Sequence, residues 1–311
     1  MKNREDAMNS IIMKCIAALF SIMLLLAGNV CLAANEEKAV TPEVQSQSTQ
    51  EVQPTVDAKT DEKIAEQRKK ILSEATAAIA ESRRALKALD EGKTEEAIKA
   101  LELATGKMEL IVARDPELAL ANVDVNVQII DVFADVETLE ATVKQATKYL
   151  KDGEVQLARP LVAGLASEIV IESVNIPLAT YPDAIKAVVP LIDNGEIKKA
   201  RIALQAALNT LVVVKEEVIP LPVVRAKAML KEAEKLAENQ ERKEEDNTKL
   251  AILLDDAESQ LKIAEILAYG DKKAFKPMFE QLDTIREKTK DGKSGTGFFD
   301  KITEQVSKIF K

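Results

Sequence analysis

A short phrase recurs three times along this chain of 311 residues: acidic or amide residues, then a glycine, then an alanine five positions after the glycine. The glycine and alanine pairs are Gly92 with Ala97, Gly153 with Ala158, and Gly195 with Ala200. Each phrase lies between two stretches of helical periodicity, so each glycine is predicted to end a helix in the left-handed conformation. Each alanine is predicted to let the next helix pack closely. The chain is therefore predicted to consist of helical hairpins.

The spacing of these glycines distinguishes between two helical architectures. They are 61 and 42 residues apart, whereas a solenoid of the tetratricopeptide type repeats about every 34 residues. Unequal hairpins packed as a bundle fit the spacing better than a solenoid with a peptide groove. The predicted fold class is all-α or mainly α.

Three segments depart from helical periodicity. Residues 122–129 alternate apolar and polar side chains, which is the pattern of a half-buried strand. Residues 169–176 and 211–219 are rich in β-branched side chains, and each run ends at a proline. We expect a sheet of two or three strands where the hairpins meet; the alternative is that these segments are buried helix ends.

The N-terminus has the pattern of an export signal. Lys14 precedes an apolar run over residues 16–27, which has the length of a signal-peptide core and is too short to span a membrane. Small residues follow, so cleavage is expected near Ala33 or Ala34. Residues 1–34 are thus predicted to be a signal peptide, and the protein is predicted to be periplasmic.

Removal of this segment would leave a chain with an unusual set of reactive groups. It would remove both cysteines, Cys15 and Cys31, whether translation starts at Met1 or at Met13, and the chain has no histidine. The usual zinc and copper sites are then excluded, as are Ser-His-Asp and Cys-His catalysis. The net charge of −9 disfavours nucleic acid as a partner. No catalytic residue, metal or cofactor is assigned.

Composition divides the rest of the chain. Residues 35–60 are rich in Glu, Gln, Ser, Thr and Pro without a period, which is typical of disorder. The predicted parts are a disordered tether (35–60), a helical domain (61–242), further helices packed on it (248–290), a flexible linker (291–297) and a short amphipathic tail helix (298–311). The tail is expected to dock on its own bundle or on a partner rather than on a membrane.

Several phrases occur in an order that suggests a family. They include Ala158-Arg159-Pro160-Leu161, the segment from Asn175 to Pro182, Ala207-Leu208-Asn209-Thr210-Leu211 and Ile219-Pro220-Leu221-Pro222. Over roughly residues 65–240 the chain resembles the YfdX family of exported bacterial proteins. The resemblance implies a periplasmic, mostly helical protein that assembles with itself and is associated with tolerance of acid or heat. It carries over no catalytic residue.

The segment from Asn175 to Pro182 is the best candidate for a binding site. Two prolines fix its path, and it holds Asn175, Thr180 and Tyr181. Together with Arg159 and Glu168 it forms a candidate binding site for a small ligand or a partner chain. The alternative is that Asn175 and Tyr181 satisfy main-chain groups at a corner of the fold.

These observations give three hypotheses about function. The first is a non-enzymatic, stress-associated protein that assembles with itself and protects or scaffolds envelope proteins. The second is a small-ligand-binding protein that uses the segment from Asn175 to Pro182. The third is an enzyme based on carboxylates or lysines. Paired acids such as Asp255 and Asp256 are interpreted as solvated helix surface, so they assign no metal.

Overall fold

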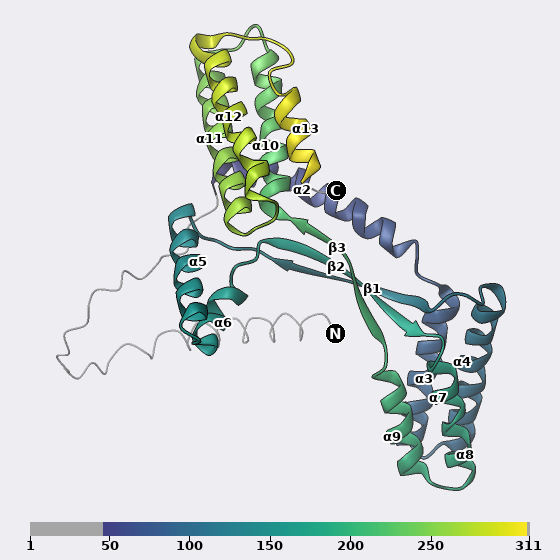
Figure 1. The fold of residues 1–311 in the computed structure, drawn as a ribbon. Helices are drawn as coiled ribbons and strands as arrows, with labels where there is room; N and C mark the ends of the chain where they lie inside the picture. The colour runs from purple at the N-terminus through teal and green to yellow at the C-terminus, as the bar shows by residue number, and fades with distance from the viewer. Residues whose placement is uncertain (1–45, 310–311) are drawn as a thin grey trace, which may run out of the picture. The chain divides into compact units, whose positions relative to one another are not determined.

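The computed structural model describes residues 46–309; the predicted signal peptide, residues 35–45 of the predicted tether and residues 310–311 lie outside this part. Helices make up most of the described chain, with one small sheet (Figure 1). The helices are α2 (Gln47–Arg68), α3 (Ser73–Asp90), α4 (Thr94–Arg114), α5 (Val136–Lys151), α6 (Val155–Ala163), α7 (Tyr181–Lys186), α8 (Val188–Asp193), α9 (Ile197–Leu208), α10 (Leu221–Glu238), α11 (Glu244–Ile266), α12 (Lys272–Thr289), the 3₁₀ turn η1 (Lys290–Gly292) and α13 (Asp300–Lys308). The predicted mainly helical class is confirmed.

The three recurring glycines end helices as predicted. Their φ angles are +72° at Gly92, +77° at Gly153 and +73° at Gly195. The amide after each glycine donates to a carbonyl five residues earlier: Lys93 to Ala88, Glu154 to Tyr149, and Glu196 to Leu191. This hydrogen bond closes the helix end with the left-handed residue inside it. The alanines five residues on are buried on the next helix, so α3–α4, α5–α6 and α8–α9 are the predicted hairpins.

The left-handed turn gives a testable stability difference. Gly153→Ala should lower the free energy of unfolding by about 1 kcal/mol, because an L-residue is strained at this φ. No atom lies within 4 Å of the added Cβ, so strain is the only cost. Gly106→Ala, inside α4 and equally free of neighbours, should instead raise stability by roughly 0.5–1 kcal/mol. Urea unfolding measures both, and a shift of both variants in the same direction would contradict this account.

The sheet has three antiparallel strands in the order β1 (Leu120–Ile130), β2 (Glu168–Pro177) and β3 (Val212–Pro220). They coincide with the three segments predicted from the sequence. In β1, Val123 and Val125 are buried while Asp124 and Asn126 are exposed, which is the alternation that a half-buried strand requires. The reading of these segments as helix ends is therefore wrong.

The buried apolar side chains form three groups. The first lies among α3, α4, α7, α8 and α9 and includes Leu101 and Tyr181. The second lies among α10, α11, α12 and α13 and includes Phe275 and Leu282. The third joins the sheet to α2 and α10 and includes Ile171. Helix α10 thus contributes to two groups and connects the sheet to the C-terminal helices.

Residues 47–60 differ from the predicted tether, because they form the first part of α2. Ser46 caps this helix, and its Oγ accepts a hydrogen bond from the amide of Thr49 at 3.2 Å. Val52 and Val56 are 2% and 0% exposed and pack in the second and third groups of buried side chains. Contact with α10 therefore orders a segment whose composition alone indicates disorder.

Helical periodicity runs from Asp61 to Leu89 in the sequence, but the structure divides this stretch into two helices. Helix α2 ends at Arg68, and α3 begins at Ser73. Between them the amide of Leu72 donates to the carbonyl of Asn122 in β1 at 2.9 Å. This hydrogen bond to the sheet takes the place of one within a continuous helix.

The predicted linker and tail are tied to α10. The amide of Gly295 donates to the carbonyl of Ala237, and the hydroxyl of Ser294 donates to the carbonyl of Asn239. In α13, Ile302 and Val306 are fully buried among α10, α11 and α12. The tail helix therefore docks on its own bundle, one of the two places expected. No helix between residues 46 and 309 combines the length and apolar composition that crossing a membrane requires.

Candidate functional site

The structure distributes the five residues of the predicted site over three elements. Arg159 is exposed on α6, which packs against α5, and Glu168 is the first residue of β2. Asn175 lies near the end of β2, while Thr180 and Tyr181 begin α7, which packs against α4 and α9. The five side chains therefore do not converge on one ligand.

The side chain of Asn175 forms hydrogen bonds within the sheet. It is 4% exposed, and its Nδ2 donates to the hydroxyl of Ser173 at 2.8 Å and to the carbonyl of Val212 at 3.3 Å. The second of these hydrogen bonds connects β2 to β3. Asn175 thus satisfies main-chain and side-chain groups of the fold, which is the alternative that the sequence left open.

The side chain of Tyr181 packs in the first group of buried side chains. It is 0% exposed, and burial raises the pKa of its hydroxyl. A ligand in solvent has no access to a side chain in this position. Only Thr180 and Arg159, of the five predicted residues, are exposed.

A buried ion pair that sequence reasoning missed lies at the meeting point of several elements. Arg225 of α10 donates from Nη1 to Oδ1 of Asp131 at 3.0 Å and from Nη2 to Oδ2 at 2.7 Å. The two side chains are 6% and 12% exposed. Nη2 also reaches Oε1 of Gln53 in α2 at 3.4 Å. The pair therefore connects α2, α10 and the loop after β1.

The polar network continues from this pair to the turn after α11. The hydroxyl of Ser167 donates to Asp131 at 2.7 Å, and the amide of Ser167 donates to the hydroxyl of Tyr269 at 2.8 Å. Burial raises the pKa of Tyr269; the hydrogen bond from Ser167 opposes this, and the carboxylate of Glu168 adds to it. Glu168 is thus the one predicted residue that lies beside this network.

One signal in the sequence could have found Arg225. It is the only charged residue in the run Leu221-Pro222-Val223-Val224-Arg225-Ala226, and a lone charge in a buried apolar run needs a partner. Asp131 gives no comparable signal, because an acid directly after a strand is common at a turn. The pairing of the two residues depends on the topology.

A pocket of about 390 Å³ lies beside the ion pair. Its wall includes Arg225, the loop from Val132 to Val136, and Gln260 and Ile263 of α11. Phe133 in that loop is 55% exposed. The pocket therefore combines buried polar groups with an apolar edge.

The α5–α6 hairpin carries exposed apolar side chains. Four of them, at 49–55% exposure, form what we call the hairpin surface: Leu150, Val155, Leu157 and Val162. In α5 only Leu139 and Ala146 are buried, and in α6 only Ala158. Helices α5 and α6 pack against each other, and α11 packs against α5. These contacts cover only part of the apolar side of the hairpin.

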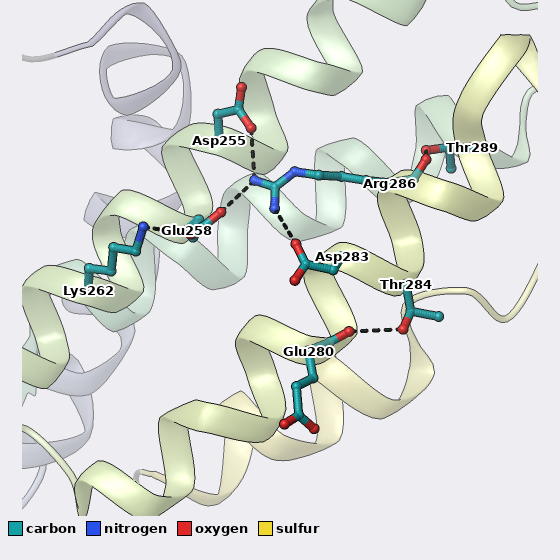
Figure 2. Close-up of polar contacts among 8 residues, drawn as sticks. All are labelled: Asp255, Glu258, Lys262, Glu280, Asp283, Thr284, Arg286 and Thr289. Atoms are coloured by element: carbon teal, nitrogen blue, oxygen red, sulfur yellow. Dashed lines mark hydrogen bonds and ion pairs between the residues drawn. The ribbon is translucent and has the colours of Figure 1, made fainter.

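The charged cluster around Arg286 joins α11 to α12 (Figure 2). Arg286 contacts Asp255 at 2.8 Å, Glu258 at 2.7 Å and Asp283 at 3.2 Å. Lys262 contacts Glu258 from the other side at 2.6 Å. The carboxylates of this cluster are therefore bound to cations of the same protein, which agrees with a structural role.

This cluster predicts a pH dependence of stability. Burial raises the pKa of Glu258, but hydrogen bonds from Lys262 and Arg286 outweigh it and hold the pKa below its ordinary value. A carboxyl with a lowered pKa stabilises the fold above its unfolded pKa of about 4.3, and this contribution is lost as the pH falls through the folded value. Glu258→Gln should therefore cost about 0.5–1 kcal/mol at pH 7 and less at pH 3.

Urea unfolding at both pH values measures this difference. Glu280→Gln is the matched control, because Glu280 is a more exposed carboxylate of α12 at 3.9 Å from Lys276. We expect no change in that variant at either pH. An equal loss in Glu258→Gln at pH 7 and pH 3 would contradict the role assigned to its charge.

Comparison with known proteins defines the family. Residues 78–217 match the family model described as YfdX protein. The resemblance to the YfdX family seen in the sequence is thus confirmed for this segment, which is a little under half of the chain. The match begins within α3 and ends within β3, so α2 and α10 to α13 lie outside it.

Solved structures are similar to part of the chain. One of them is a crystal structure of YfdX from Salmonella Typhi, with 14% sequence identity and a TM-score of 0.32. The similarity covers 48% of this chain and 91% of that chain. Comparison with the curated proteins gave no match.

Proposed function

We propose that this protein is a non-enzymatic, exported stress-associated protein that assembles with itself and holds other envelope proteins as they unfold. The match of residues 78–217 to the YfdX family model supports the stress association. The hairpin surface is the observation that carries the binding role, because its apolar side chains are about half exposed. Export rests on the predicted signal peptide.

The size of the hairpin surface sets the expected strength of binding. Full burial of a valine or leucine side chain contributes roughly 1.5–3 kcal/mol, and about half of each of the four side chains remains to be covered. Several kcal/mol are thus available to a partner before the cost of association is subtracted. Contacts of this strength form and dissociate readily, which suits a protein that holds unfolding chains.

The same surface serves self-association in this proposal. A second copy covers it when no unfolded protein is present, and an unfolded chain competes for it under stress. The small-ligand alternative receives less support, because Asn175 and Tyr181 are committed to the fold.

Suppression of aggregation tests the proposal. A purified enzyme that aggregates on heating is mixed with this protein at equal molar amounts, and light scattering is recorded. We expect a clear reduction relative to the same mass of serum albumin. Scattering equal to that of the albumin control, in heat and in acid, would rule out the chaperone-like role.

A further inference from the structure

One edge of the sheet has no partner strand in the described part of the chain. Strand β1 pairs with β2 alone, and other elements bond to its outer edge only near its start. The amide of Leu72 donates to the carbonyl of Asn122, and the hydroxyl of Thr76 donates to the carbonyl of Val123. Beyond these, no hydrogen bond from another element reaches this edge within residues 46–309. We call the outer edge from Asp124 to Ile130 the free edge.

The hydrogen-bond pattern of the sheet shows which main-chain groups lie on the free edge. Ser167, just before β2, accepts from the amide of Leu221 and so bonds toward β3. Because the bonds alternate along an antiparallel strand, Ile169 also bonds toward β3 and not toward its β1 partner, Ile129. The amides and carbonyls of Ile129, and of Val127 two residues earlier, therefore point away from β2.

A pocket of about 480 Å³ lies beside these main-chain groups. Its lining includes Val127 and Ile129 of β1 and Ile64 of α2. The side chain of Ile129 is 65% exposed, so solvent reaches this apolar lining. Strand addition combines main-chain hydrogen bonds at a sheet edge with pockets for alternate side chains of the incoming segment. The free edge and this pocket supply both features.

Charge at the rim of this pocket indicates which segment fits. Asp57 and Asp61 of α2 line the pocket and are exposed. Neither carboxylate forms an ion pair in the described part of the chain, although Asp57 accepts a hydrogen bond from Gln53 at 2.7 Å. The lining also contains Asp131 and Arg225, whose charges are paired with each other. The remaining charge is negative, so it favours a lysine or arginine on the ligand.

We propose that the free edge binds an extended segment of another protein as an added strand of the sheet. Main-chain groups of the segment exchange hydrogen bonds with Val127 and Ile129. A branched apolar side chain of the segment enters the pocket against Ile64. A lysine or arginine two residues away lies on the same face of the added strand and meets Asp57 or Asp61. This site is distinct from the hairpin surface and does not depend on it.

Fluorescence polarisation with three labelled peptides tests the site. The first is Thr-Val-Thr-Lys-Thr-Val-Thr, in which the valines and the lysine share one face of a strand. The second has glutamate in place of the lysine. The third has the side chains of the first and a methyl group on every peptide nitrogen, so it cannot donate main-chain hydrogen bonds. We expect the purified protein to bind the first peptide at least tenfold more tightly than either of the others.

Three variants of the protein test the same contacts. Ile129→Pro removes an amide from the free edge, a position at which a strand tolerates proline, and should weaken binding of the first peptide about tenfold. Asp61→Asn, at an exposed position, should reduce the preference for lysine over glutamate about threefold. Val213→Pro is the matched control, because Val213 is 54% exposed on β3 at the other edge of the sheet. It should bind the peptide as the original protein does, and circular dichroism checks that each variant is folded.

The outcomes separate this site from the proposed function. Leu150→Asp/Leu157→Asp alters the hairpin surface and should retain peptide binding, so the two proposals can fail independently. Equal binding of the methylated peptide, or unchanged binding in Ile129→Pro, would overturn strand addition. If the first peptide does not bind, the proposal is wrong; a change in sedimentation of Ile129→Pro would then assign the free edge to a second copy of the chain.

Discussion

In the double variant Leu150→Asp/Leu157→Asp, the proposed self-association and the proposed protection of other proteins are each expected to fall by at least tenfold. Both side chains are about half exposed on the hairpin surface, and a carboxylate at either position would have to be desolvated on contact with an apolar partner. The fold should persist, because neither leucine belongs to a group of buried side chains. Sedimentation velocity measures the assembly, and light scattering measures the protection.

Leu103→Asp is the matched control for this prediction. Leu103 is 50% exposed on α4, so it carries the same kind of side chain on a different helix. Its assembly and protection should remain within twofold of the original protein. An equal loss in Leu103→Asp would mean that any added charge acts through solubility, and the hairpin surface would lose its special role.

The second large effect concerns the buried ion pair. Asp131→Ala should lower the free energy of unfolding by about 3–5 kcal/mol, because it leaves the charge of Arg225 buried without a counterion. It also removes the acceptor for the hydroxyl of Ser167. Urea unfolding monitored by circular dichroism measures the change.

Two further variants separate the ion pair from general damage. Asp131→Leu/Arg225→Met replaces both charges by apolar groups and should recover most of the lost stability, because neither charge is then left unpaired. Lys63→Ala breaks an exposed pair with Glu217 at 3.6 Å and should cost less than about 1 kcal/mol. A double variant as unstable as Asp131→Ala would mean that packing, rather than charge, dominates at this position.

The features predicted well from the sequence are those that local chemistry decides. A glycine after the last polar residues of a helix is the residue that best tolerates φ near +75°, so Gly92, Gly153 and Gly195 could be assigned to turns. The alternation of Val123, Asp124, Val125 and Asn126 likewise depends on neighbours along the chain. These patterns placed the hairpins and the sheet.

Features that depend on distant contacts were not predictable in this way. The first half of α2 is rich in Gln and Thr, and its order comes from packing of Val52 and Val56 against other elements. The turn after α11 has a non-glycine residue, Ala268, at φ 60°, which no local pattern in the sequence indicates. There the amide of Tyr269 donates to the carbonyl of Ala264, and the hydroxyl of Tyr269 accepts from the amide of Ser167, which is distant in the sequence.

For the candidate sites too, local patterns could be predicted from the sequence, whereas burial and exposure could not. Asn175 and Tyr181 are polar residues near prolines, and a segment of this kind can be a binding loop or a structural corner of the fold. Both side chains are buried, which favours the structural role. The exposure of the hairpin surface could not be predicted from the sequence either, because the apolar spacing of α5 predicts a buried face whether or not a partner covers it. Only the arrangement of α6 and α11 shows which part stays uncovered.

Photocrosslinking in intact cells tests most directly whether the hairpin surface is where this protein meets its partners. The photoreactive residue p-benzoylphenylalanine replaces Leu157 in one variant and Lys273, exposed on α12, in the other. We expect position 157 to crosslink to a second copy without stress and to envelope proteins during heat or acid stress, while position 273 gives few products. Equal crosslinking at the two positions, or none at position 157 under stress, would contradict this expectation.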